Sequence, residues 1–335
     1  MRIRAIAFVI VFLMTSLVTF AGGGREARDV RVAIRAGGSS VGGIFYVMSA
    51  AVASVVNEHV PEVNFTVQTT AGVLESYNRL VRGGLEVFVQ NADIPYLGFH
   101  GGDPAHPTLI PSKNVRTWFV VEPSPFLVVS RTDNTRITRF EDVWAPGVRV
   151  GTRPRGNTPH TLLVHLTEFA GRDFDAINIF PGGHEQSAHA LRDRNIDVLV
   201  TGSGTLSGPN SAHQEMASAA SIRLFNFPDP LRDQLVREFP WWGKFTLPPN
   251  WLQGHSQPTE VVAILNSFFI CSTVPDEIVY KMTKAVFANL DTLVAIAPTA
   301  FGTLNRQTAS VNAVIPFHPG AARYFAGNGI TVSVE

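Results

Sequence analysis

The chain has 335 residues, of which 45% are hydrophobic and 16% charged, and its 27 basic residues balance 27 acidic ones. A net charge of zero provides no attraction to phosphate backbones, so the composition argues against nucleic-acid binding. The length exceeds what one hydrophobic core comfortably holds, which favours two domains. Cys271 is the only cysteine, so an intrachain disulfide is excluded.

The N-terminus has the pattern of a secretory signal. Arg2 and Arg4 precede an apolar stretch, 5–17, and small residues follow around Ala21. We therefore expect a cleaved signal peptide, 1–21, and a mature periplasmic chain with 25 basic and 27 acidic residues. A retained membrane anchor is the alternative, but the apolar stretch is shorter than the roughly 20 residues that a spanning helix needs. No cysteine follows the signal, which argues against a lipoprotein anchor.

The mature chain begins with alternating strand and helix patterns. A strand at 32–34, a glycine-serine turn and an amphipathic helix are followed by a strand at 63–69, a helix at 74–82 and a strand at 86–90. This order predicts a parallel sheet with right-handed connections. Ligands of such sheets collect at the carboxyl ends of the strands.

A second cycle of the same order follows a loop at 95–113 and strands at 115–121 and 125–130. It comprises a strand at 148–151, a helix at 159–170, a strand at 176–180, a helix at 184–194 and a strand at 197–200. The fold class is therefore α/β, with two lobes of similar construction.

The remaining chain predicts how the lobes are joined. Residues 228–255 read as loop-rich, with tryptophans interpreted as core anchors rather than a lid, and a strand at 260–272 precedes a helix at 275–295. Crossings near 125–131 and 262–272 would return the C-terminal helices to the first lobe. We expect lobe I to comprise 30–125 and 264–335, lobe II to comprise 126–263, and a ligand cleft to lie between them.

Two turns are candidate anion sites. The turn at 37–43 and the turn at 153–158 each precede a helix, whose free N–H groups and partial positive charge favour an anion. Tyr46 could instead belong to the core, and Asp93 could instead cap a helix. The candidate ligand-binding residues are Ser39, Ser40, Gly42, Gly43, Tyr46, Thr70, Ala71, Gly72, Asn91, Asp93, Arg155, Gly156, Asn157, Thr158, Gly202 and Ser203.

Five motifs in order resemble the TAXI family of TRAP-transporter solute-binding proteins. They are Gly-Gly-Ser-Ser-Val-Gly-Gly-Ile-Phe-Tyr at 37–46, Gln-Thr-Thr-Ala-Gly-Val-Leu-Glu-Ser at 68–76, Gln-Asn-Ala-Asp at 90–93, Pro-Arg-Gly-Asn-Thr at 154–158 and Phe-His-Pro-Gly-Ala-Ala-Arg-Tyr at 317–324. The resemblance implies a type II periplasmic-binding-protein fold, a TRAP permease as membrane partner, and small carboxylates such as glutamate, glutamine or 2-oxoglutarate as solutes.

Two positions depart from that family. Ile44 and Phe45 stand where the family usually has Thr and Tyr, so apolar groups replace a hydroxyl and a phenol. The family commonly has Gly-Ser-Gly-Thr where this chain has Arg-Gly-Asn-Thr at 155–158, so an arginine and an amide replace small residues. Arg155 either forms a bidentate contact with a ligand carboxylate or covers the cleft rim. In the first case we expect a dicarboxylate or keto acid without a free amino group.

Other functions fit the sequence less well. Residues 38–42 match the G-x-S-x-G pattern of a serine hydrolase, but they follow the first strand of the mature chain, which leaves no earlier strand to supply an oxyanion donor. A secreted scaffold with a vestigial cleft is a further alternative. Histidines at 160 and 165, and at 184 and 189, are five apart, whereas a zinc helix needs a spacing of four. No catalysis, cofactor or metal is expected.

Overall fold

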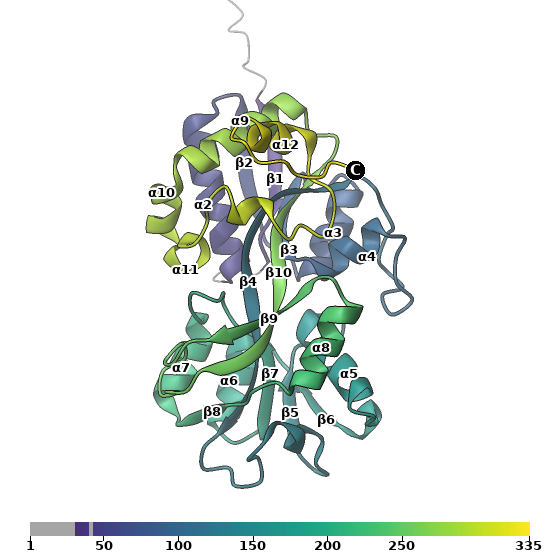
Figure 1. Cartoon of the computed structure of the whole chain (residues 1–335), viewed down its shortest axis with the longest axis vertical. Helices are drawn as coiled ribbons and strands as arrows, with labels where there is room; N and C mark the ends of the chain where they lie inside the picture. Colours follow the sequence, from purple (N-terminus) through teal and green to yellow (C-terminus); the bar gives the residue numbers. More distant parts are fainter. Residues whose placement is uncertain (1–30, 40–42) are drawn as a thin grey trace, which may run out of the picture.

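The protein consists of two lobes joined by two long strands (Figure 1). The computed structural model describes residues 31–39 and 43–335, so the predicted signal peptide lies outside the described residues. The upper lobe in Figure 1 contains both the purple N-terminal elements and the yellow C-terminal ones. The prediction of a two-lobed α/β fold is confirmed. Among the described residues, no helix is long and apolar enough to cross a membrane.

Lobe I contains a mixed sheet, because only its first three strands are parallel as predicted, whereas β10 (Thr259–Cys271) runs antiparallel to its neighbours. The sheet runs in the order β2-β1-β3-β10-β4, where β4 is Val115–Arg131. In this sheet, strand β1 pairs in parallel with both β2 and β3, and β10 pairs antiparallel with β3 and β4. Its first elements are β1 (Val32–Gly37), α2 (Ile44–His59), β2 (Val63–Gln68), α3 (Val73–Val81), β3 (Val87–Asn91) and α4 (Asp93–Phe99). The βαβαβ prediction for this part of the chain is confirmed.

Lobe II repeats this arrangement. Strand β5 pairs in parallel with β6 and β7, and β4 pairs antiparallel with β7 and β8. The elements are η1 (Phe140–Trp144), β5 (Arg149–Thr152), α5 (Thr158–Phe169), η2 (Phe174–Ala176), β6 (Asn178–Pro181), α6 (His184–Arg192), β7 (Val198–Gly202), α7 (Ser211–Ala219), β8 (Ile222–Leu224), α8 (Asp229–Glu238) and β9 (Trp242–Leu247).

The two lobes share β4 (Val115–Arg131) and β10 (Thr259–Cys271). Pro125 pairs with Ala263 of β10, whereas the next residue, Phe126, pairs with Gly202 of β7. The sequence predicted two strands here, but the structure has one. Prolines are tolerated in this strand because it changes partners there, beside a register shift in β10. The predicted lobe boundaries, 125/126 and 263/264, stay a prediction.

Three predictions about local structure are wrong. The predicted loop at 95–113 overlaps helix α4, and the loop-rich region at 228–255 contains α8 and β9. A proline within the first turn of α8 is compatible with a helix, since its missing N–H has no partner there. The predicted helix at 275–295 is divided at Asn289, whose ψ of 37° leaves the helical region. The C-terminal elements are α9 (Asp276–Ala288), α10 (Leu290–Ile296), α11 (Pro298–Phe301), η3 (Thr308–Ser310) and α12 (Pro319–Ala326).

Aromatic side chains fill both cores. In lobe I, Phe119 stacks on Phe268 with ring centroids 4.6 Å apart, and both side chains are buried. Near the crossing strands, Trp242 packs edge-on against Phe126 at 4.9 Å. Trp251 is also buried and donates from Nε1 to the carbonyl oxygen of Leu206 at 2.8 Å. These contacts assign Trp242 and Trp251 to the core.

Candidate functional site

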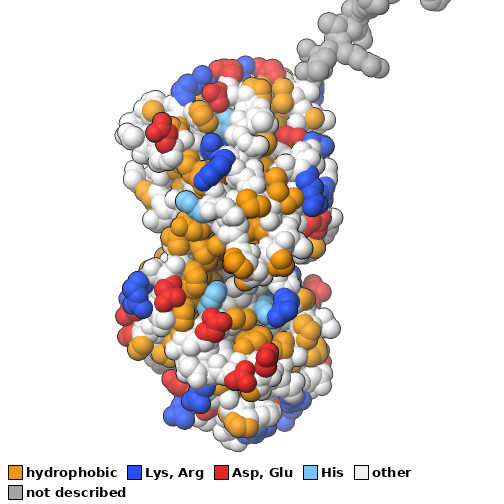
Figure 2. Space-filling view, turned by 90° about the vertical axis from the view of Figure 1, so that its right-hand side faces the viewer, with side chains coloured by type: hydrophobic (Ala, Val, Ile, Leu, Met, Phe, Trp, Pro, Cys, Tyr) orange, Lys and Arg blue, Asp and Glu red, His pale blue; other side chains and the backbone are white. Residues whose placement is uncertain are grey.

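A cavity of about 520 Å³ lies between the lobes. Figure 2 shows the molecule narrowing at this level. The floor comes from lobe II, the roof from lobe I, and the shared strand β4 contributes Ser124 and Phe126. Ser124 Oγ donates to the carbonyl oxygen of Gly204 at 2.8 Å and accepts from Nδ2 of Asn266 at 2.8 Å. The wall of the cavity is therefore fixed to both shared strands and to lobe II.

Five helices begin at this cavity. The residues that precede the first helical residue of α2, α3, α5, α6 and α7 all line it: Gly43, Gly72, Asn157, Gly183 and Asn210. Each helix N-terminus carries unpaired N–H groups and a partial positive charge of about half a unit. Because these ends converge from both lobes, the cavity favours a negatively charged ligand.

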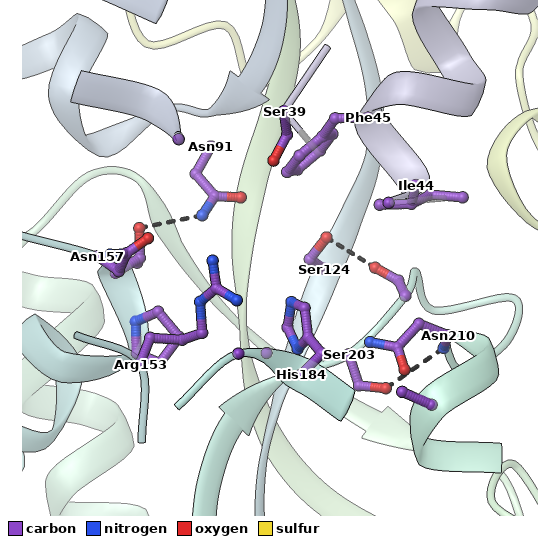
Figure 3. A pocket seen from close by; sticks show the side chains of 18 of the residues that line it. Ser39, Ile44, Phe45, Asn91, Ser124, Arg153, Asn157, His184, Ser203 and Asn210 are labelled. Carbon is purple, nitrogen blue, oxygen red and sulfur yellow. Dashed lines mark hydrogen bonds between the residues drawn. The ribbon is translucent and has the colours of Figure 1, made fainter. Parts of the chain in front are cut away.

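Arg153 adds a full positive charge. It follows the carboxyl end of β5, and Figure 3 shows its guanidinium pointing into the cavity. Its guanidinium forms no hydrogen bond or ion pair with another of the described residues. Partial burial lowers the pKa of Arg153, which reflects the cost of holding this charge away from water. Glu185, the acidic residue that lines the cavity, is exposed.

One histidine, His184, lies beside this arginine, and a second, His213, packs against the first. Burial and the nearby charge of Arg153 lower the pKa of His184 to about 4, and Nδ1 of His184 has no partner among the described residues. His213 lies edge-on to His184, with ring centroids 5.4 Å apart, and its Nδ1 is 2.7 Å from Oγ of Ser203. Burial holds the pKa of His213 well below its usual value. The floor of the cavity thus has one cation, Arg153, and one uncharged imidazole, His184, at neutral pH, whereas His213 does not line the cavity.

The lobes contact each other through Thr205 of lobe II, which donates to the carbonyl oxygen of Thr299 of lobe I, and at an edge of the cavity. Thr158, the first residue of α5, accepts a hydrogen bond from Nδ2 of Asn91 at 3.0 Å and donates to Asp93 at 2.8 Å. Asp93 is buried, and burial raises the pKa of its carboxyl. This chain of three polar side chains links β3 and α4 of lobe I to α5 of lobe II.

The sequence-based candidates divide into three groups. Those that line the cavity are Ser39, Gly43, Gly72, Asn91, Asn157, Thr158, Gly202 and Ser203. Ser40 and Gly42 lie outside the described residues. The candidates that do not line it are Tyr46, Thr70, Ala71, Asp93, Arg155 and Gly156.

Among the candidates that do not line the cavity, Thr70 contacts a residue that does. Thr70 Oγ1 accepts from the backbone N–H of Ser39 at 3.1 Å, and the backbone N–H of Ala71 donates to Glu75 at 2.6 Å. Arg155 is exposed, and the turn that carries it continues into Gly156 at φ +85°. The arginine of the cavity is Arg153, two residues earlier in the same turn. The expectation that Arg155 faces the ligand therefore has no support from its position.

Other lining residues were missed by sequence reasoning. Arg153 and His184 occupy the first turns after two lobe II strands, and the repeated βα order could have indicated both positions. Asn210 precedes α7, a helix that the sequence did not predict. Gln90 lies one residue before the predicted Asn91, and its Nε2 has no partner among the described residues.

Comparisons with known proteins agree with this architecture. Residues 36–329 match the NMT1-like family. No curated protein sequence matches the chain. Among solved structures, the periplasmic binding protein BugD is similar with a TM-score of 0.53 and 12% identity, covering 89% of this chain and 94% of that one. MatC (Rpa3494) from Rhodopseudomonas palustris, solved with bound malate, has a TM-score of 0.53 and 14% identity over 84% of this chain and 94% of its own. The chain therefore belongs to the NMT1-like family and has the fold of periplasmic binding proteins.

Proposed function

We propose that this protein is a periplasmic receptor that binds a small organic anion between its two lobes. The proposal is carried by one cavity that is lined both by five helix N-termini and by Arg153, whose guanidinium has no partner among the described residues. Neutral hydrogen-bonding groups can bind many solutes, but this combination specifically favours negative charge. His184 does not add a second charge at neutral pH, because its pKa is about 4.

The mechanism that we propose is closure without chemistry. An anion that contacts Arg153 of lobe II and the N-termini of α2 and α3 of lobe I interacts more strongly with the closed arrangement than with an open one. Motion about β4 and β10 would then bring residues 126–263 toward the remainder of the mature chain.

We also propose that the receptor belongs to the TAXI type and delivers its solute to a TRAP permease. The five motifs described above support this assignment, as does the N-terminal pattern of a cleaved signal, 1–21, which leads to the periplasm. Small carboxylates such as glutamate, glutamine or 2-oxoglutarate are the solutes that the resemblance suggests, whereas a dicarboxylate or keto acid was expected from an arginine that faces the ligand. We favour this function over the serine-hydrolase and scaffold alternatives because the cavity concentrates groups that bind anions.

A thermal-shift screen of carboxylates, sulfonates, amino acids and sugars on the mature protein tests the proposal. A ligand present at 100 times its Kd should stabilise the native state by about 2.7 kcal/mol.

Arg153→Gln should weaken binding of the best anion roughly tenfold to a hundredfold, because a hydrogen bond to a charged group contributes about 1.5–3 kcal/mol. Exposed Arg155→Gln is the matched control, and it should bind as the wild type does. Stabilisation by uncharged sugars alone, or equal losses in both variants, would overturn the anion-receptor proposal.

A further inference from the structure

The roof of the cavity differs in character from its floor. Ile44 and Phe45, the first two residues of α2, line it together with Val73 of α3. Figure 3 shows Ile44 and Phe45 on the lobe I side, across the cavity from Arg153 and His184. Phe126 of β4 and Pro159 of α5 add further apolar lining. The cavity therefore has a charged end and an apolar wall.

The protein core does not fully bury the side chains of Ile44 and Phe45. Ile44 and Phe45 pack against the core of lobe I but are only half-buried. Neighbouring Met48, one turn further along α2, is completely buried. The uncovered surface of Ile44 and Phe45 faces the cavity, where an apolar part of a ligand would remove it from water. Burial of such surface is favourable in proportion to its area.

The charges that line the cavity suit one carboxylate rather than two. Arg153 is the one Lys or Arg side chain among the described lining residues, and Glu185 is the one acid. A second carboxylate, extended from Arg153 toward Ile44 and Phe45, would lose water beside apolar side chains and would meet only the partial charges of the α2 and α3 N-termini, with no Lys or Arg side chain as a partner. A volume of about 520 Å³ also leaves room for a ligand body beyond the charged head group.

We propose that the preferred solute is a monocarboxylate with an apolar body, its carboxylate held by Arg153 and its apolar part against Ile44 and Phe45. This inference rests on the proposed receptor function and narrows its solute class. It replaces the second carboxylate that the sequence suggested with a hydrocarbon group.

Hexanoate and adipate provide a matched pair of probes, because both have six carbons and differ in whether the far end is a methyl or a carboxylate. Calorimetric titration of the mature protein should show tighter binding of hexanoate than of adipate. Binding should also strengthen from butanoate to hexanoate by roughly tenfold, since each buried methylene contributes about 0.8 kcal/mol.

Variants of α2 locate the apolar contact. Ile44→Thr should weaken hexanoate binding roughly threefold to tenfold and should weaken acetate binding less, because acetate has no chain to reach this side chain. Val47→Thr is the control, because Val47 lies on the same helix and does not line the cavity. Both replacements exchange one β-branched side chain for another, so their effects on the helix are matched.

The outcomes separate this inference from the receptor proposal. If adipate binds more tightly than hexanoate and Arg153→Gln abolishes both, the receptor stands and the monocarboxylate inference is wrong. The inference is also wrong if chain length has no effect or if Ile44→Thr and Val47→Thr behave alike. Failure of every anion in the wider screen would overturn the receptor and this inference together.

Discussion

Thr158 donates a hydrogen bond of 2.8 Å from its hydroxyl to Oδ2 of Asp93 in the opposite lobe. The same hydroxyl oxygen accepts from Asn91 at 3.0 Å. A Cβ added to Gly72 of lobe I would approach Oδ1 of Asn157 in lobe II at 3.4 Å, so the Asn157 side chain lies close to the Gly72 backbone at this edge. The lobes are thus linked by protein–protein contacts, which set a baseline for closure before any ligand contributes.

Thr158→Val should shift the equilibrium toward an open form. Valine has a similar shape but removes both hydrogen bonds, and it leaves the buried Asp93 carboxyl without its hydroxyl donor. The loss of such a contact costs about 1–3 kcal/mol. Small-angle scattering of the unliganded variant should give a larger radius of gyration than the wild type.

Thr161→Val is the control for this prediction. Thr161 lies one turn further along α5, and its hydroxyl interacts only locally, with the carbonyl oxygen of Asn157 at 3.5 Å. Its scattering profile should match the wild type. Equal expansion of both variants would assign the effect to α5 itself rather than to the contact between lobes.

An anionic ligand should make the wild-type protein more compact. The expected change is a reduced radius of gyration at saturating ligand with constant far-ultraviolet circular dichroism, because rotation about β4 and β10 moves the lobes without altering their elements. Identical profiles with and without ligand would instead indicate a receptor that is already closed, with the Thr158 contact as the reason.

The buried histidines should make folding stability depend on pH. The pKa of His213 is held well below its usual value by burial and by neighbouring His184, whose own pKa is about 4. The unfolded chain therefore binds more protons between pH 6.5 and 4 than the folded protein does. The contribution of these two histidines to the free energy of unfolding is fully present above about pH 6.5 and is lost as the pH falls toward 4.

Melting temperatures from pH 7.5 to 4.5 measure this effect. The variant His184→Gln should show a shallower decrease than the wild type, whereas His59→Gln, which changes an exposed histidine, should retain the wild-type slope. Asp93 contributes with the opposite sign because its pKa is raised on folding. Comparison of slopes between variants therefore isolates the histidine contribution, and parallel slopes for all three proteins would contradict it.

The sequence predicts the repeated βα units well and the site's side chains less well. The periodicity of hydrophobic residues and the positions of the glycine turns locate β1 to β3 and β5 to β7, because local sequence patterns determine these elements. They do not distinguish Arg153 from Arg155, because which side chain faces the cavity depends on the path of the turn into Gly156. The prolines around Ser124 also suggested a strand break, although exchange of partners between β10 and β7 keeps β4 continuous.

Arg153 should make the receptor prefer an anion without an amino group. Leucine and 4-methyl-2-oxopentanoate differ at the α-carbon, where an ammonium replaces a keto oxygen, and both present a carboxylate and the same apolar body. With the carboxylate on Arg153, the ammonium lies within several ångströms of the guanidinium, and His184 provides no compensating negative charge. Repulsion of about 1–3 kcal/mol at the intermediate dielectric of such a site corresponds to a preference of roughly fivefold to a hundredfold for the keto acid.

Titration calorimetry on the wild type and on Arg153→Gln measures the ratio of the two dissociation constants. The ratio should fall toward one in the variant if the guanidinium causes it. Tighter binding of leucine by the wild type, or an unchanged ratio in Arg153→Gln, would show that another group sets the selectivity.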